Sequence, residues 1–138
     1  MLNIEYVGSL DEELGEIIGV EFSKYAIENG VICKYKPFTF VAKESDEIIG
    51  VVTGYSYYDE VHIQDIVVYD QYRNNYIGSK LIEAVEDYYK HGGFVNINLS
   101  TYNFQAPDFY GKCGFQIEFV RENRENPKLN KYFFIKYF

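Results

Sequence analysis

The chain has 138 residues and a formal net charge of −8, a length that suits one domain and leaves no room for a second. Such a negative surface repels a phosphate backbone and carries no basic stripe, so nucleic acid is excluded as the expected ligand. No run of about 18 apolar residues could span a bilayer, the start lacks a secretory signal, and Cys33 and Cys113 lack metal-site or redox spacing. We therefore expect a reduced, cytoplasmic protein with no membrane segment and no metal.

The N-terminal quarter of the chain predicts one strand followed by one helix. Residues 3 to 8 form a short β-rich run, and Ser9 and Glu12 have the spacing of a capping box. Apolar residues then recur at helical spacing as far as Asn29 and Gly30, which predicts an amphipathic helix that ends there.

The next segment predicts a hairpin and a further strand. Residues 38 to 43 and 48 to 57 are β-rich and are separated by a polar turn at residues 44 to 47. Residues 62 to 68 predict the strand that follows.

The second half of the chain begins with a change of period at Tyr76. Apolar residues then repeat every three to four positions at Ile77, Leu81, Ala84 or Val85, and Tyr88, until Gly92 and Gly93 end the helix. A strand at residues 95 to 100, a short helix at 106 to 112, and strands near 115 to 121 and 131 to 138 complete the order.

This order predicts an α/β or α+β fold around one mixed sheet in a single domain that spans residues 1 to 138. A run of hairpin strands precedes a strand-helix-strand unit. We therefore expect a mostly antiparallel sheet with one parallel pair, formed by strands 62 to 68 and 95 to 100.

The strongest local signal is the junction at residues 66 to 81, where an apolar strand passes through a polar turn into a helix. The first N–H groups of a helix are unpaired and carry a partial positive charge, so an anion can bind there. Arg73 and Lys80 would add charge for a phosphate, and Gly78 would let the backbone approach it. The segment is neither a Walker loop nor a dinucleotide fingerprint, because it lacks the glycine and lysine spacing of both.

Two motifs together make the chain resemble the GCN5-related N-acetyltransferases. The junction resembles the family's V-x-P-x-x-R-G-x-G-x-G, with Val68, Arg73 and Gly78 in register. A second segment resembles N-x-x-A-x-x-[LF]-Y-x-x-x-G-F, matched at Asn103, Ala106, Phe109, Tyr110, Gly114 and Phe115. Two departures stand in the first motif: Tyr76 replaces a glycine, and Asp70 replaces a proline.

The resemblance implies helices on both faces of the sheet, parallel strands that splay apart, and acetyl-CoA as the co-substrate. The backbone of Ile66, Val67 and Val68 would then pair with the pantetheine amides. Arg73 and the N–H groups of Asn74, Asn75, Tyr76, Ile77, Gly78 and Ser79 would hold the pyrophosphate. Asn103 would contact the pantetheine arm or cap its own helix, and both readings stay open.

The implied chemistry is direct attack of a neutral amine on the thioester, which needs a proton acceptor and an acid for the leaving thiolate. By resemblance, Tyr110 is the expected acid. Asp65, His62 and Glu60 are the candidates for the base, and Asp65 is favoured, acting directly or through a water. Alternation along a strand separates Asp65 from His62 unless a bulge intervenes.

The sequence therefore predicts an N-acetyltransferase that acetylates a primary amine of a small molecule or a protein, and a homodimer is compatible with this. One alternative is a CoA-binding sensor or partner module of the same fold without catalysis. The other is a nucleotide-binding or structural domain in which the junction only makes a turn.

Overall fold

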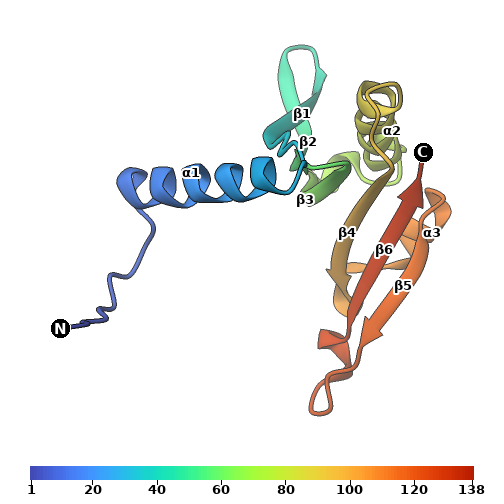
Figure 1. Cartoon of the computed structure of the whole chain (residues 1–138). Coiled ribbons are helices and arrows are strands. Elements are labelled where there is room, and N and C mark those ends of the chain that lie inside the picture. Colours follow the sequence, from blue (N-terminus) through green and yellow to red (C-terminus); the bar gives the residue numbers. More distant parts are fainter. The chain divides into compact units, whose positions relative to one another are not determined.

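The computed structural model describes residues 1–138, and the chain divides into two parts, residues 1–33 and residues 34–138 (Figure 1). No helix in either part has the length and apolar composition that crossing a bilayer requires.

Residues 1–33 contain one helix, α1 (Glu12–Glu28), which confirms the predicted helix and its end at Asn29. The predicted capping box is wrong, because Asp11 is the N-cap and its Oδ1 accepts a 2.8 Å hydrogen bond from the N–H of Leu14. This start places Glu12 and Glu13 in the first turn, where carboxylates are favoured by the helix dipole.

The strand predicted at residues 3 to 8 is also wrong, because these residues form no strand. An extended segment is stable as a strand only where a neighbour completes its hydrogen bonds, and residues 3 to 8 pair with no other segment. Local alternation of apolar residues could not reveal the missing partner.

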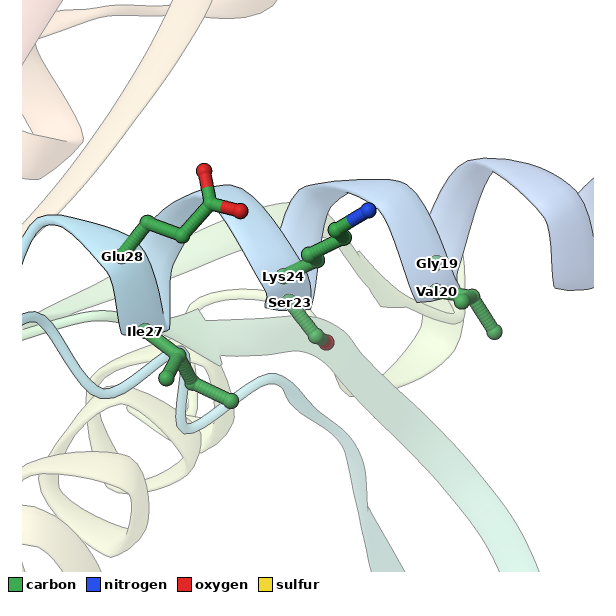
Figure 2. A pocket seen from close by; sticks show the side chains of 6 residues that line it. All are labelled: Gly19, Val20, Ser23, Lys24, Ile27 and Glu28. Atoms are coloured by element: carbon green, nitrogen blue, oxygen red, sulfur yellow. The ribbon is translucent and has the colours of Figure 1, made fainter.

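A shallow hollow lies on one side of α1 and is lined by Gly19, Val20, Ser23, Lys24, Ile27 and Glu28 (Figure 2). Residues three and four apart lie on one face of a helix, so this hollow is the surface of a single helix. It contains no constellation of catalytic side chains.

Residues 34–138 form one six-stranded sheet in the order β1-β2-β3-β4-β6-β5. Its strands are β1 (Lys36–Glu44), β2 (Glu47–Tyr57), β3 (Glu60–Val68), β4 (Asn96–Tyr102), β5 (Gln116–Arg121) and β6 (Lys131–Tyr137). The helices are α2 (Ile77–Tyr89) and α3 (Asp108–Lys112), with 3₁₀ turns η1 (Asp70–Tyr72), η2 (Asn103–Gln105) and η3 (Pro127–Leu129). All six predicted strands after residue 33 and the two predicted helices are therefore confirmed, with shifts of a few residues at their ends.

The pairing also confirms the predicted mixture of directions. β3 and β4 are the one parallel pair, and every other neighbouring pair is antiparallel. The hairpin between β1 and β2 turns at Ser45 and Asp46, which both have positive φ as a two-residue hairpin turn requires. β6 lies between β4 and β5, so the last strand of the chain is internal to the sheet.

One hydrophobic core joins the sheet to α2 and α3. α2 contributes Leu81, Ile82, Val85 and Tyr89, α3 contributes Tyr110, and β2, β3, β4 and β6 contribute alternate residues. Tyr88, one of the residues whose spacing predicted this helix, is exposed, whereas its neighbour Tyr89 is buried. The helix is rotated so that the 81–85–89 line meets the sheet.

Candidate active site

The parallel strands β3 and β4 separate after only three residue pairs. They pair from Glu60 with Asn96 to His62 with Asn98, and no residue of β3 beyond His62 pairs with β4. Figure 1 shows β1–β3 and β4–β6 as two differently oriented groups of strands. The sheet is therefore open on one edge of β3, from Ile63 to Val68.

A β-bulge in β3 places Asp65 and His62 on the same face of the sheet. Asp65 lies opposite Thr53, and His62 lies opposite Tyr55. Three positions along β3 therefore correspond to two positions along β2. Gln64 is the extra residue of the bulge. Since residues directly opposite each other share a face, both side chains lie on the face away from α2 and α3.

The backbone of β3 beside the open edge alternates between two directions. The N–H of Tyr69 donates to the carbonyl of Ile49 at 3.0 Å, so hydrogen-bonded pairs fall on Tyr69, Val67 and Asp65. Ile66 and Val68 consequently direct their backbone groups toward the open edge, where the carbonyl of Val68 accepts a hydrogen bond from Nε of Arg73. Val67 is used within the sheet, so the backbone groups of Ile66 and the N–H of Val68 are the ones available for the predicted contacts with pantetheine.

The loop between β3 and α2 contains two residues in the left-handed region. Asn74 has φ 66° and Tyr76 has φ 62° and ψ 16°, so the tyrosine that replaces a motif glycine has a left-handed backbone. A left-handed conformation costs a residue with a Cβ about 1–2 kcal/mol. Alternating left-handed residues of this kind turn successive N–H groups toward one concavity that can hold an anion.

Six consecutive backbone N–H groups, from Asn74 to Ser79, donate no hydrogen bond to another protein group. Tyr76 is the N-cap of α2 and its side chain caps nothing, so the first N–H groups of the helix stay free. The partial positive charge of the helix N-terminus acts at the same place. The loop and helix together form a site with the hydrogen-bond donors and the charge that a phosphate requires.

Arg73 lies at this loop but is held by its neighbours. Its Nε donates to the carbonyl of Val68 at 3.1 Å, and its Nη1 lies 2.7 Å from Oδ1 of Asp70. The two side chains are 62% and 85% exposed, so their ion pair contributes little to stability. The guanidinium is therefore free to turn toward an anion at modest cost.

Gly78 fits against α3, which was not expected from the sequence. A Cβ on residue 78 would lie 3.0 Å from Cζ of Phe109. The absent side chain therefore serves the contact between α2 and α3, while the N–H of Gly78 stays among the free donors. Burial raises the pKa of the nearby Cys113 thiol, whose Sγ lies 3.8 Å from Oγ of Ser79.

Tyr110 is buried on α3, within the core cluster that lies under the separating strands. Burial, followed by the negative charges of Cys113 and Asp65, raises the pKa of Tyr110 to about 12. Its hydroxyl makes no hydrogen bond within the protein. Tyr110 therefore remains a protonated phenol, and it packs in the core on the face of the sheet opposite to Asp65.

Asn103 does not cap the 3₁₀ turn that it begins. Its Oδ1 accepts a 3.3 Å hydrogen bond from the hydroxyl of Tyr132, and Gln105 is the residue whose side chain accepts from the N–H of Tyr102. The amide nitrogen of Asn103 has no protein acceptor and its side chain is exposed. Of the two open readings, the structure contradicts capping and leaves a donor for a ligand.

Sequence reasoning missed Asn96 and Asn98 on β4. Both lie on the face of the sheet that also carries His62, and their amides form hydrogen bonds with each other and with β3. The alternation of these asparagines with Ile97 and Leu99 was the available signal, because polar residues at every second strand position share one face.

Comparison with known proteins agrees with this geometry. The model of the acetyltransferase (GNAT) family matches residues 7–115, more than half of the chain. The chain therefore belongs to the GNAT acetyltransferase family. A comparison with curated proteins finds no sequence relative.

Three solved structures illustrate the similarity. An acetyltransferase from Bacillus cereus ATCC 14579 is 28% identical with a TM-score of 0.78, and the match covers 97% of this chain and 98% of that one. A protein assigned as an acetyltransferase from Agrobacterium tumefaciens shares the fold at 18% identity and a TM-score of 0.82, over 99% and 100% of the chains. A protein assigned as a streptothricin acetyltransferase from Bacillus anthracis, in complex with acetyl coenzyme A, is 27% identical over 80% and 67%, with a TM-score of 0.65.

Proposed function

We propose that this protein transfers the acetyl group of acetyl-CoA to a primary amine of a small molecule or a protein. The observation that carries the proposal is the row of free N–H groups at residues 74–79, next to the open edge of β3. The free N–H groups would bind the pyrophosphate of a CoA molecule, and the open edge of β3 would pair with the extended amide chain of its pantetheine arm. Family membership supports the same donor.

In this proposal the N–H groups from Asn74 to Ser79 bind the pyrophosphate, and Arg73 adds a positive charge. The outward backbone groups of Ile66 and the N–H of Val68 pair with the pantetheine amides on one side. Asn103 donates from the other side through the amide nitrogen that is free of protein partners. Residues 1 to 138 act as one transferase domain, and the two free cysteines fit a reducing cytoplasm.

Tyr110 is proposed to stabilise the leaving thiolate. A free thiol has a pKa of about 8.5, whereas the pKa of Tyr110 is about 12. Complete transfer of the phenol proton to the thiolate is therefore unfavourable. A hydrogen bond from the phenol to the developing thiolate is favourable without such transfer. Tyr110 thus stabilises the leaving thiolate as a hydrogen-bond donor, and solvent supplies the proton when CoA leaves.

Asp65 is proposed to receive the proton that converts an ammonium ion into the attacking amine. It lies on the face opposite to Tyr110, and its charge is felt at that phenol. This arrangement would admit the acceptor from one face and the thioester from the other. The exposed position of Asp65 suits transfer through a water.

The net charge supports a cationic acceptor. With a net charge of −8, the protein attracts cationic amines over long range. The streptothricin acetyltransferase among the similar structures makes streptothricin a reasonable first acceptor to test, next to polyamines and peptides with an exposed lysine.

The test combines binding with turnover. Acetyl-CoA at 100 times its dissociation constant should stabilise the fold by about 2.7 kcal/mol in a thermal melt, whereas ATP should not. Free CoA release should then depend on the added amine. Stabilisation without release for every amine would support a non-catalytic CoA-binding module, and an unchanged melting temperature would remove the proposal.

A further inference from the structure

A chain of side-chain hydrogen bonds crosses from β3 to β4 where the two strands last pair. Nδ2 of Asn96 donates to Oε1 of Glu60 at 3.2 Å, and Nδ2 of Asn98 donates to Oδ1 of Asn96 at 2.9 Å. Oδ1 of Asn98 then lies 2.7 Å from Nδ1 of His62. Asn96 is only 5% exposed, so its hydrogen bonds are made within the protein.

The direction of every bond in this chain follows from its end at Glu60. An ionised carboxylate only accepts hydrogen bonds, so Asn96 must turn its NH₂ group toward Glu60. The oxygen of Asn96 then faces the NH₂ group of Asn98, and the oxygen of Asn98 faces His62. Because an amide oxygen only accepts, Nδ1 of His62 must carry the proton, and in the neutral ring Nε2 is left as an acceptor.

His62 lies where Nε2 could accept a proton during the proposed transfer. His62 and Asn98 are the last pair before β3 and β4 separate, and the bulge places Asp65 on the same face as His62. The ring of Tyr55 packs against the imidazole, with centroids 5.2 Å apart. The ring is thus held on one edge by Asn98 and on one side by Tyr55.

In the proposed transfer the acceptor nitrogen enters as an ammonium ion and leaves as an amide, so it loses two protons, and solvent adds one proton to the thiolate. Asp65 accepts the first proton, which converts the ammonium ion into the attacking amine. Attack then forms the N–C bond and leaves a positive charge on nitrogen, and the C–S bond breaks as the second proton departs.

We propose that Nε2 of His62 takes this second proton, and that Glu60, Asn96 and Asn98 are positioning residues that hold the imidazole in the Nδ1–H form. This assignment rests on the proposed function. The imidazolium keeps its Nδ1–H bond to Asn98, and the carboxylate of Glu60 ends the chain with a compensating charge. His62 returns its proton to solvent after the product leaves.

The tautomer can be observed without any activity. The chain has two histidines, so two-bond ¹H–¹⁵N spectra of the full-length protein contain two imidazoles, and His91→Gln identifies the signals of His62. We expect His62 as the Nδ1–H form in the parent and in Asn98→Asp, whose carboxylate still accepts from Nδ1. Asn98→Leu should release the ring toward the Nε2–H form. An Nε2–H form in the parent protein would overturn the inference even if acetyl transfer is active.

Kinetics test the use of that nitrogen. With a reactive amine at saturation, His62→Gln and Asn98→Leu should lower kcat by on the order of 10²-fold, with little change in acetyl-CoA affinity. Asn98→Asp should restore most of the loss. Parent-like kcat in His62→Gln with chemistry rate-limiting would overturn the role of His62 in proton transfer. Absence of transfer by the parent protein would instead refute the proposed function. The spectra distinguish that outcome from failure of the hydrogen-bond chain, because they report the tautomer of His62 without any activity.

Discussion

Gly78 on α2 lies so close to Phe109 on α3 that a Cβ on residue 78 would be 3.0 Å from the ring carbon Cζ. This contact joins the two sequence motifs in space, because Gly78 belongs to the first and Phe109 to the second. The short helix that carries Tyr110 is therefore seated directly on the helix whose N-terminus carries the free N–H groups.

The first prediction concerns Gly78→Ala. An alanine inside an exposed helix stabilises it by about 1 kcal/mol relative to glycine. Overpacking against Phe109 should cost about 1–3 kcal/mol, so we expect net destabilisation in urea unfolding. Adding Phe109→Leu should recover part of the loss. A single variant that is more stable than the parent would show that Phe109 moves aside freely.

The second prediction concerns the left-handed residue Tyr76, which has φ 62°. Tyr76→Ala keeps the backbone strain and removes the ring, whereas Tyr76→Gly removes both. The glycine variant should be about 1 kcal/mol more stable than the alanine variant, because glycine adopts positive φ without a Cβ clash. Urea unfolding of the two variants measures this difference. Equal stability would mean that the loop has another conformation in solution.

The third prediction concerns Arg73→Ala. The side chain is 62% exposed and its partner Asp70 is 85% exposed, so unfolding free energy should change by less than about 1 kcal/mol. Acetyl-CoA affinity should fall by about five- to tenfold, because a charge-assisted phosphate contact is lost. Asp70→Asn is the matched control and should tighten binding by freeing Arg73. A fall in stability without a fall in affinity would make Arg73 structural.

The fourth prediction concerns turnover in Tyr110→Phe. The ring and its packing remain, while the donor to the thiolate is removed. Turnover at saturating amine should fall by on the order of 10²-fold with little change in the acetyl-CoA dissociation constant. Single-turnover kinetics should be used, so that product release does not hide the effect. Parent turnover under these conditions would leave Tyr110 as a packing residue.

The same residue gives a fifth prediction, on stability against pH. Burial raises the pKa of Tyr110 from about 10 in the unfolded chain to about 12 in the fold. The unfolded state then loses this proton first, so the stability due to Tyr110 is complete below pH 10 and is lost as the pH rises toward 12. Between pH 10 and 11 the loss is about 1 kcal/mol. Urea unfolding of Tyr110→Phe should show a correspondingly smaller decline over this interval than the parent does.

The order of elements after residue 33 and the two motifs of the family could be read from the sequence. Periods of two and about 3.6, together with glycines at helix ends, are local properties that each segment carries by itself. The same local signals failed at residues 3 to 8, because a strand depends on a partner that its own residues do not specify. The helical repeat also did not decide that Tyr89, and not its neighbour Tyr88, is buried against the sheet.

The relations that define the candidate site were decided by the tertiary structure. The bulge at Gln64 places Asp65 beside His62, and the register of β3 against β4 brings Asn98 within 2.7 Å of the imidazole. Tyr76 adopts the left-handed conformation because the turn between β3 and α2 requires it. The bulge and the register depend on pairing between strands, and local residue preferences fix neither that register nor the backbone angles that it imposes.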